Sequence, residues 1–482
     1  MSKVKKSMSL NAVVNGFQTV LKVIFPLITY PYISRVLQVN QLGRFNFAAS
    51  IVSYVTLVAS LGIPTYAVRE GAKFRDDKGR ISRFASEIFT INILSTITAY
   101  ALLIICVEVI SKKLQTYSSL IFTLSISVMF TTLGCEWVYQ IYEEYVYIAI
   151  RGIIFQLLSL LLLFTTVKTQ DDLLRYAMIS VIASSGSNIV NMFGLHKYCK
   201  IRISFNFDIK KSIVPILVLF ANTLATTLYV NSDTTILGFL SGDRAVGIYS
   251  VSTKVYILVK QLLSAVIIVS IPRLSYFWGN NEIDEFTALG KKIIDSLIVV
   301  VLPATVGLFS LSKYIVLFIS APEFVSAEYS MRILSIALFF SLFSWFYTSC
   351  ILIPAKRETT VLKATIFAAC INIALNFVLI PLWKERAAAL TTVIAEACSF
   401  LICFIASRKV ALVLPNIKNF VSVLIGCIYI YIICLLIVQA NLGTILTVIA
   451  SIALSAIGYL GILKILKNET LDYLLGSIVK RK

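Results

Sequence analysis

The sequence predicts an all-α polytopic membrane protein with about fourteen transmembrane helices. Of its 482 residues, 58% are hydrophobic and only 14% are charged, and the mean hydropathy is +0.89. A soluble domain typically has about 45–50% apolar and about 25% charged residues. This composition excludes a soluble enzyme, a disordered tail and a fibrous protein.

Apolar runs long enough to cross a bilayer, which takes about 20 residues, recur along the whole chain. Short polar segments separate the first six runs, and the basic segment Lys197–Lys211 follows them. The longest polar insert of the second half is Arg273–Lys292. We expect helices near 10–34, 45–68, 84–110, 117–141, 146–167, 173–196, 213–240, 247–271, 293–312, 329–353, 361–383, 387–407, 418–438 and 442–463.

The positive charges predict how the chain is oriented. The sequence has 43 Lys and Arg residues against 24 Asp and Glu residues, a formal net charge of +19. If the N-terminus is cytoplasmic, the cytoplasmic segments carry about three times as many Lys and Arg residues as the opposite ones, as the positive-inside rule requires. We therefore expect both termini in the cytoplasm. The excess charge indicates retention at a membrane face, and we expect no nucleic-acid partner.

The sequence offers little for catalysis or metal binding. His196 is the only histidine, which argues against a zinc site or a histidine-based triad. The nine cysteines form no CxxC pair and mostly lie in apolar runs, so we expect small hydrophobic side chains rather than disulfides. No GxxxxGK[ST] motif for ATP is present, and every external loop is short. The function class that remains is a channel or transporter, and we expect it to have no resident cofactor or metal.

A weak internal repeat divides the chain. Leu37–Phe45 (LQVNQLGRF) is similar to Leu240–Tyr249 (LSGDRAVGIY), and each is followed by a helix that we expect to end in Ile-Pro. The two segments lie six spans apart, which predicts two lobes in parallel repeat, a known transporter plan. The predicted parts are a first lobe at 1–196, a cytoplasmic linker at 197–212, a second lobe at 213–407, and two further helices with a tail at 408–482.

Polar stripes run along the first two spans of each predicted lobe. Asn15, Gln18 and Lys22 share one helix face, Asn46 begins the stripe of the second span, and Asn222 lies on the seventh. Together these stripes would line a central aqueous cavity. The alternative is that Ser, Thr and Asn side chains join the helices by interhelical hydrogen bonds.

Ionisable residues deep in a membrane are costly and usually functional, at about 2.5–3.5 kcal/mol or more each. Lys22 and Lys260 lie near mid-span, and Lys254 lies about two turns inside its span. A cavity with these lysines suits an anionic or phosphate-bearing ligand. The acids Asp233, Glu396 and Glu136 are candidates for coupling or charge pairing. Asp233 could pair with Lys254 or Lys260, whereas Glu396 has no evident partner and could carry a proton or cation.

Four segments resemble one known family. They are FPLITYPYISRVL (Phe25–Leu37), SLGIPTYAVRE (Ser60–Glu70), GCEWVYQIYEEYVYIAIR (Gly134–Arg151) and YVNSDTTILGFLSG (Tyr229–Gly242). They are similar to the Wzx flippases of bacterial polysaccharide units, within the multidrug/oligosaccharidyl-lipid/polysaccharide exporter superfamily. The chain departs from the usual pattern at Gln38–Gln41, where an acidic or glycine-containing turn is common, and at Ala67–Val68.

The resemblance implies a function. Members carry undecaprenyl-pyrophosphate-linked oligosaccharide repeat units from the cytoplasmic to the periplasmic leaflet of the bacterial inner membrane, for O-antigen, capsule or related polymers. It implies alternating access with a cationic cavity, in which Lys22, Lys254 and Lys260 would bind the substrate and Arg69 would guard the inner mouth. A polysaccharide polymerase and a chain-length regulator are conceivable partners, and proton or sodium coupling stays open.

Two other functions compete with this one. A drug or cation exporter of the same superfamily would need acids rather than lysines in its cavity. A polymerase or ligase of the same pathway would need a large external loop, which the sequence lacks.

Overall fold

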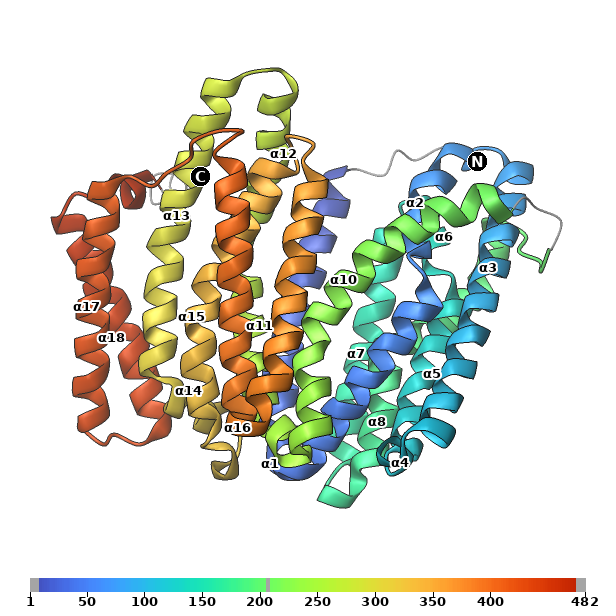
Figure 1. Cartoon of the computed structure of the whole chain (residues 1–482), viewed down its shortest axis with the longest axis horizontal. Coiled ribbons are helices and arrows are strands. Elements are labelled where there is room, and N and C mark those ends of the chain that lie inside the picture. The colour runs from blue at the N-terminus through green and yellow to red at the C-terminus, as the bar shows by residue number, and fades with distance from the viewer. Residues whose placement is uncertain (1–7, 205–208, 474–482) are drawn as a thin grey trace. The chain divides into compact units, whose positions relative to one another are not determined.

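All regular secondary structure in the described part of the chain is helical (Figure 1). The computed structural model describes residues 8–204 and 209–473, with side chains placed from residue 24 onward except at 209–212 and 222. The chain divides into two compact units, Met1–Phe239 and Leu240–Lys482. The all-α membrane fold class predicted from the sequence is confirmed.

Unit 1 (Met1–Phe239) is a bundle built around its first long helix. Helix α1 packs against α3, α5 and α7, and α5 packs against α8 and α9. Its α-helices are α1 (Met8–Ser60), α2 (Ile63–Gly71), α3 (Lys78–Ile104), α4 (Lys112–Gln115), α5 (Ser118–Gly134), α6 (Glu136–Ile141), α7 (Tyr145–Thr166), α8 (Leu173–Val181), α9 (Ser187–Gly194) and α10 (Ile209–Ser241).

Unit 2 (Leu240–Lys482) is a second helical bundle, centred on α15. Helix α15 packs against α11, α13 and α16, and α17 packs against α13 and α18. Its α-helices are α11 (Asp243–Leu263), α12 (Ala265–Gly279), α13 (Ile283–Ser310), α14 (Ser312–Ile319), α15 (Ala327–Phe346), α16 (Glu358–Ser407), α17 (Ile417–Gln439) and α18 (Thr444–Ile465).

Many of these helices can cross a membrane. Ten helices in the described residues are long and apolar enough, or eleven when α11 and α12, which bend by 41° at their junction, count as one span. Helix α5 is a shorter apolar helix. Helices α1 and α16 each cover two predicted spans and contain one non-helical residue, Gln38 and Lys384 respectively. The chain is thus a multi-pass membrane protein, while the count of fourteen stays a prediction.

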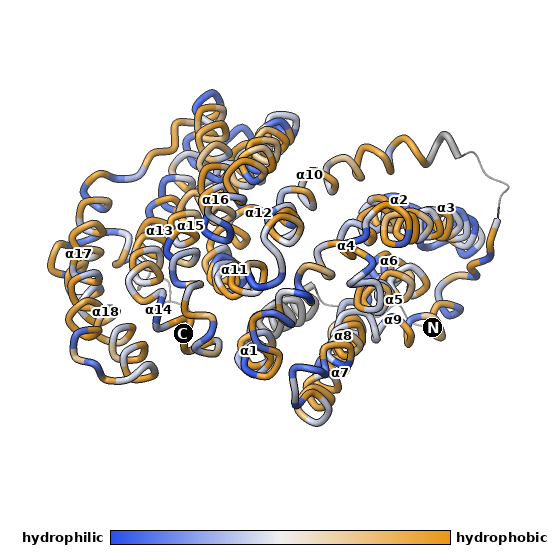
Figure 2. The backbone as a smooth tube through the Cα atoms, turned by 60° about the horizontal axis from the view of Figure 1, so that its bottom comes forward, coloured by the Kyte–Doolittle hydropathy of each residue, from blue (hydrophilic) through white to orange (hydrophobic). Residues whose placement is uncertain are grey.

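The apolar surface of the helices explains why they suit a bilayer. On α17 and α18, the side chains of Ile428, Ile449 and Ile457 are 60%, 58% and 70% exposed, and hydrophobic colour dominates both helices in Figure 2. A small residue lies where the two helices touch, because a Cβ atom added to Gly426 would come within 2.5 Å of the Tyr459 ring. Close packing through small residues is the usual way in which helices associate in lipid.

The predicted repeat has a counterpart in the backbone. Gln38, at the break in α1, has φ 58° and ψ −179°. Gly242, which precedes α11, has φ 82° and ψ −176°. The same unusual conformation therefore occurs within the two segments whose sequences are similar. The Ile-Pro pairs differ, because Ile63–Pro64 begins α2 whereas Pro272 lies inside α12.

Helix α10 belongs to unit 1 by its contacts. The Thr235 hydroxyl donates to Ser50 Oγ at 3.0 Å, and Lys113 Nζ donates to the carbonyl oxygen of Gly238 at 2.7 Å. The sequence places this span in the second lobe, at 213–407. The predicted division and its linker stay predictions, and the compact units differ from them in this helix.

Connecting segments gather at the end of unit 1 where α2, α3 and α6 meet (Figure 1). The Tyr142 hydroxyl donates to the carbonyl oxygens of Arg75 at 3.2 Å and Tyr198 at 3.3 Å. Arg75 also pairs with Glu143 at 2.7 Å. The segments that contain Arg75, Tyr142 and Tyr198 are all predicted to be cytoplasmic. Their common position agrees with the predicted alternation of spans.

Candidate functional site

Four of the predicted cavity residues lie outside the described side chains. They are Asn15, Gln18 and Lys22 on α1 and Asn222 on α10. The site is therefore built from the charged and polar residues whose side chains are placed, taken separately in each unit.

A buried ion pair joins α11 to α16 in unit 2. Lys260 Nζ lies 3.1 Å from Glu396 Oε1, and the Tyr256 hydroxyl donates to the same oxygen at 3.2 Å. Glu396 is 6% exposed. The expectation that Glu396 lacks a helix partner is wrong, because folding brings Lys260 beside it across 136 residues of sequence. The charge of Lys260 is thereby compensated.

Lys254 stands apart from this pair. It lies six residues before Lys260 on the same helix and is partly buried. Within the described part of the chain its ammonium group makes no hydrogen bond or ion pair. Among the side chains that the structure places, Lys254 therefore has no counter-charge, and it lies on the α11–α12 segment that is apolar enough to cross a membrane.

A second ion pair lies in unit 1. Arg151 Nη2 on α7 is 2.5 Å from Glu136 Oε2 on α6, and the Arg151 side chain is only 5% exposed. The guanidinium group also lies over the rings of Tyr147 and Tyr139, at 5.5 and 6.0 Å from their centroids. Arg151 falls near the start of the helix predicted at 146–167. In the structure α7 begins at Tyr145 and carries Arg151 into the bundle, where it is buried.

A polar cavity adjoins this pair within unit 1. It has a volume of about 260 Å³. The Arg151 Nε and Nη1 atoms and the Trp137 Nε1 atom nearby are enclosed without a hydrogen-bond partner in the described residues. Most buried polar groups in proteins are paired. Three unpaired donor atoms beside one cavity are therefore unusual. Its lining residues are Thr56, Ala59, Ser60, Pro64, Asn92, Val128, Thr131, Thr132, Glu136, Trp137, Gln140, Ser184 and Asn188.

The remaining predicted residues are less suited to binding a ligand. Arg69 is exposed and pairs with Glu70 at 3.1 Å. Asn46 Nδ2 donates to the carbonyl oxygen of Leu42 at 2.7 Å, one turn earlier on α1. Asp233 is buried on α10 and 6% exposed. The Asn46 hydrogen bond thus lies within its own helix and is not one of the interhelical bonds of the packing alternative.

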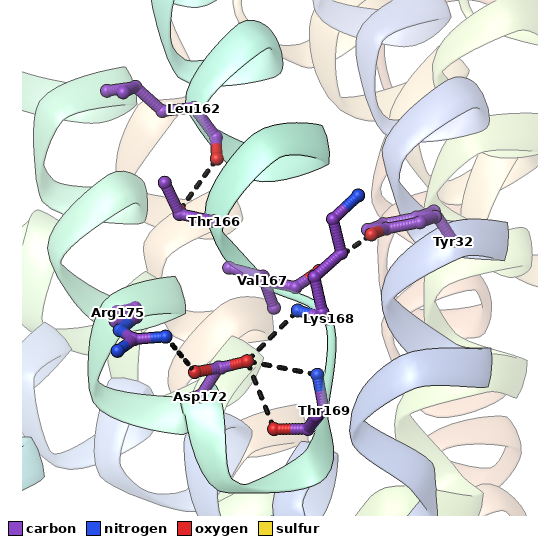
Figure 3. Close-up of polar contacts among 8 residues, drawn as sticks. All are labelled: Tyr32, Leu162, Thr166, Val167, Lys168, Thr169, Asp172 and Arg175. Atoms are coloured by element: carbon purple, nitrogen blue, oxygen red, sulfur yellow. Dashed lines mark hydrogen bonds and ion pairs between the residues drawn. The ribbon is translucent and has the colours of Figure 1, made fainter.

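The turn between α7 and α8 shows a different arrangement of charges (Figure 3). Asp172 Oδ2 accepts from the backbone N–H groups of Lys168 and Thr169, each at 3.0 Å, and Arg175 Nη1 lies 2.5 Å from Asp172 Oδ1. Lys168 Nζ donates to the carbonyl oxygen of Phe164. The open groove here, of about 600 Å³, is therefore lined by cations that already have partners. The contacts stabilise the turn.

Electrostatics at the predicted cytoplasmic end of unit 1 stabilise helix ends. The backbone N–H groups of Arg80 and Gly79 donate to Asp77, which caps α3, and hold the pKa of this carboxyl below its ordinary value. A carboxyl group whose pKa is lowered by folding stabilises the fold at pH values above its ordinary pKa. This stabilisation is lost as the pH falls through the lowered pKa. In the same region, the hydrogen bond that Arg75 donates to Glu143 stabilises the charged guanidinium group and raises the pKa of Arg75.

Neither unit contains a metal site in its described residues, where no group of three or more His, Cys, Asp or Glu side chains could hold an ion. All nine cysteines are free thiols. The sequence did not reveal that Arg151 is buried beside a cavity, because the partner and the lining residues lie on other helices. The only signal was an arginine beside a long apolar run.

The sequence matches one protein family among those compared. The family model described as "Polysaccharide biosynthesis protein" matches residues 10–278. A protein of Escherichia coli (strain K12) named "Putative O-antigen transporter" is 24% identical over 412 residues, which cover 83% of this chain and 95% of the relative. The capsular polysaccharide biosynthesis protein CapF of Staphylococcus aureus is 25% identical over 367 residues, covering 74% of this chain and 88% of CapF.

The fold has a solved counterpart. The lipid II flippase MurJ in its inward closed conformation superposes with a TM-score of 0.74 at 15% sequence identity, covering 95% of this chain and 99% of MurJ. This likeness concerns the fold. The named activities among these proteins are those of transporters and a flippase rather than of enzymes.

Proposed function

The chain belongs to the polysaccharide biosynthesis protein family, and from this premise we propose that it is a flippase for lipid-linked oligosaccharide repeat units. The cargo would be an undecaprenyl-pyrophosphate-linked unit of the O-antigen or capsule type. It would cross from the cytoplasmic to the periplasmic leaflet of the bacterial inner membrane by alternating access. Both chain termini would lie in the cytoplasm.

The observation that carries this proposal is Lys254. A lysine inside a membrane-spanning segment costs about 2.5–3.5 kcal/mol on insertion scales, so such residues usually serve a function. Lys254 has no counter-charge among the described residues, and a lysine ammonium binds phosphate as a point charge. The diphosphate of the cargo would supply the missing negative charge.

Lys260 has a different role in this account. Glu396 compensates its charge at 3.1 Å, so Lys260 would position α11 and contribute only part of its charge to the substrate. Lys22 remains a proposed second anchor for the diphosphate. Arg69, at the end of α2, would meet the headgroup at the inner mouth.

The direction of transport agrees with the membrane potential. Moving one negative charge outward across a membrane that is negative inside gains about 2.3 kcal/mol per 100 mV. The diphosphate would therefore assist its own export, and a proton or sodium gradient could add to this. A polysaccharide polymerase and a chain-length regulator would then receive the exported unit.

A drug or cation exporter is the second candidate, and the ion pairs disfavour it. Such a protein needs an uncompensated acid, whereas Glu136 and Glu396 each lie beside a basic partner, at 2.5 and 3.1 Å. Increased drug sensitivity of a deletion strain, with unchanged surface polysaccharide, would favour this second function.

Gene deletion with complementation tests the proposal. Deletion should abolish surface polysaccharide and cause lipid-linked repeat units to accumulate in the cytoplasmic leaflet. Lys254→Arg should restore export, Lys254→Ala should not, and Lys409→Ala, an exposed lysine in the turn before α17, serves as the matched control. Full export by Lys254→Ala at normal expression would contradict the role of Lys254.

A further inference from the structure

The polar cavity of unit 1 offers a different chemistry from that of Lys254. Its lining contains one charged residue, Glu136, and the Glu136 carboxylate is already paired with Arg151. A phosphate would find no cation in the lining, and a cation would find no net negative charge. The cavity therefore suits a neutral ligand.

The hydroxyl groups of the cavity present acceptors to such a ligand. Thr56 Oγ1 donates to the carbonyl oxygen of Val52 at 2.9 Å, and Thr131 Oγ1 donates to that of Ser127 at 2.8 Å. Ser60 uses its proton in the same way, on Leu57 at 3.2 Å. Because each hydroxyl proton is bound to the hydroxyl's own helix, the oxygen lone pairs remain as acceptors.

The side-chain amides supply both acceptors and donors. Asn92 and Asn188 are each 6% exposed. Asn92 Nδ2 donates to the carbonyl oxygen of Ala59 at 2.8 Å, and Asn188 Oδ1 accepts from Asn191 at 3.4 Å. Within the described residues, Asn92 Oδ1 and Asn188 Nδ2 have no hydrogen-bond partner, and neither does the amide of Gln140. A neutral ligand rich in both donors and acceptors would satisfy them.

The size of the cavity limits the ligand. A water molecule occupies about 30 Å³ of liquid, so 260 Å³ corresponds to roughly nine waters. This is slightly below the roughly 300–1,000 Å³ of pockets for drug-sized molecules. One pyranose ring with its hydroxyl groups matches both the volume and the mixture of donors and acceptors, and Trp137 adds an aromatic wall of the kind that sugar C–H faces pack against.

We propose that this cavity binds one neutral sugar ring of the cargo, separately from the diphosphate. The assignment rests on the proposed function for the identity of the cargo. Most of the lining residues lie on the parts of α1, α3, α5 and α6 that are predicted to face the cytoplasmic half of the bilayer, where a unit made in the cytoplasm would first meet the protein. The cavity would then discriminate among repeat units by the hydroxyl pattern of one sugar.

Sugar binding can be measured without transport. The purified full chain in lipid nanodiscs is mixed with neutral methyl pyranosides, with and without N-acetyl groups, and contacts are detected by saturation-transfer NMR. Gln140→Leu should weaken binding of the preferred glycoside about threefold to tenfold, the effect of one lost hydrogen bond. Gln140→Leu combined with Thr131→Val should weaken it further. Within the described residues, neither side chain makes a hydrogen bond to another helix, so the variants should keep the melting temperature of the wild type.

Two matched controls locate the effect. Gln439→Leu changes an exposed glutamine at the end of α17, and Thr98→Val removes an exposed hydroxyl that donates to the carbonyl four residues earlier, as Thr131 does. Both should bind like the wild type. Equal binding by all variants, or no glycoside binding by the wild type, would overturn the assignment. Because the assay involves no export, its failure would leave the flippase proposal standing.

Discussion

Gln38 occupies a backbone conformation that side chains rarely adopt. Its φ of 58° and ψ of −179° lie in a region that is used almost only by glycine, and holding another residue there costs about 1–3 kcal/mol. The similar position in the second half is a glycine, Gly242. Gln38, where the sequence departs from the family pattern, is therefore a strained residue that the rest of unit 1 holds in place.

Gln38→Gly should stabilise the protein. The Gln38 side chain is exposed, so the change loses little contact and relieves the backbone, and the free energy of unfolding should rise by about 1–3 kcal/mol. Thermal unfolding in detergent measures it. Gly242→Ala is the reverse test, because nothing lies within 4 Å of an added Cβ atom there and only backbone strain should lower the melting temperature. No shift in either variant would contradict the strain.

The pair of Glu136 and Arg151 gives a second residue-level prediction. Glu136→Gln should lower the melting temperature markedly, because an unpaired buried charge typically costs about 3–5 kcal/mol and Arg151 is 5% exposed. Arg151→Met should cost less, since the partly exposed Glu136 can be hydrated. The double variant should recover part of the loss relative to Glu136→Gln. Additive losses in this double-mutant cycle would show that the two residues are not coupled.

At the scale of elements, the pair of Lys260 and Glu396 joins α11 to α16. Lys260→Glu and Glu396→Lys should each reduce expression and thermal stability, whereas the charge-swapped double variant should restore much of both. Contacting residues in one ion-pair network usually show coupling energies of about 0.5–3 kcal/mol. A swapped variant no more stable than the worse single variant would mean that the two helices do not depend on this contact.

The elements themselves were largely predictable from hydropathy. Long apolar runs give the helices, and the polar turns separate them at nearly the expected residues. The partner of Glu396 was not predictable, because pairing across 136 residues depends on how the helices pack. The burial of Arg151 was not predictable for a related reason, because it depends on packing against Glu136 and Tyr147 in the folded bundle.

At the scale of the whole molecule, the charge distribution predicts the orientation in the membrane. The segments around Arg75, Glu143 and Tyr198 meet at one end of unit 1. In unit 2, the backbone N–H of Asn416 donates to Asp295 at 2.9 Å, and Lys292 lies over the ring of Tyr473. Segments predicted to share the cytoplasmic side are therefore neighbours within each unit.

Reporter fusions test this orientation. Alkaline phosphatase, which is active only outside the cytoplasm, should be inactive when fused after Asp76 or Lys409 and active when fused after Lys168. The positive-inside rule gives this pattern because basic residues are retained in the cytoplasm. The reversed pattern would invert the topology, and with it the direction of transport proposed here.

The most direct test of the central claim is flipping in a defined membrane. The purified chain is reconstituted into vesicles whose lipid-linked repeat units start in one leaflet, and a membrane-impermeant sugar-modifying enzyme reports their arrival in the other. Arrival is expected with the wild type and Lys254→Arg, and none with Lys254→Ala or protein-free vesicles. Wild-type vesicles that behave like protein-free vesicles, or equal flipping by Lys254→Ala, would contradict it.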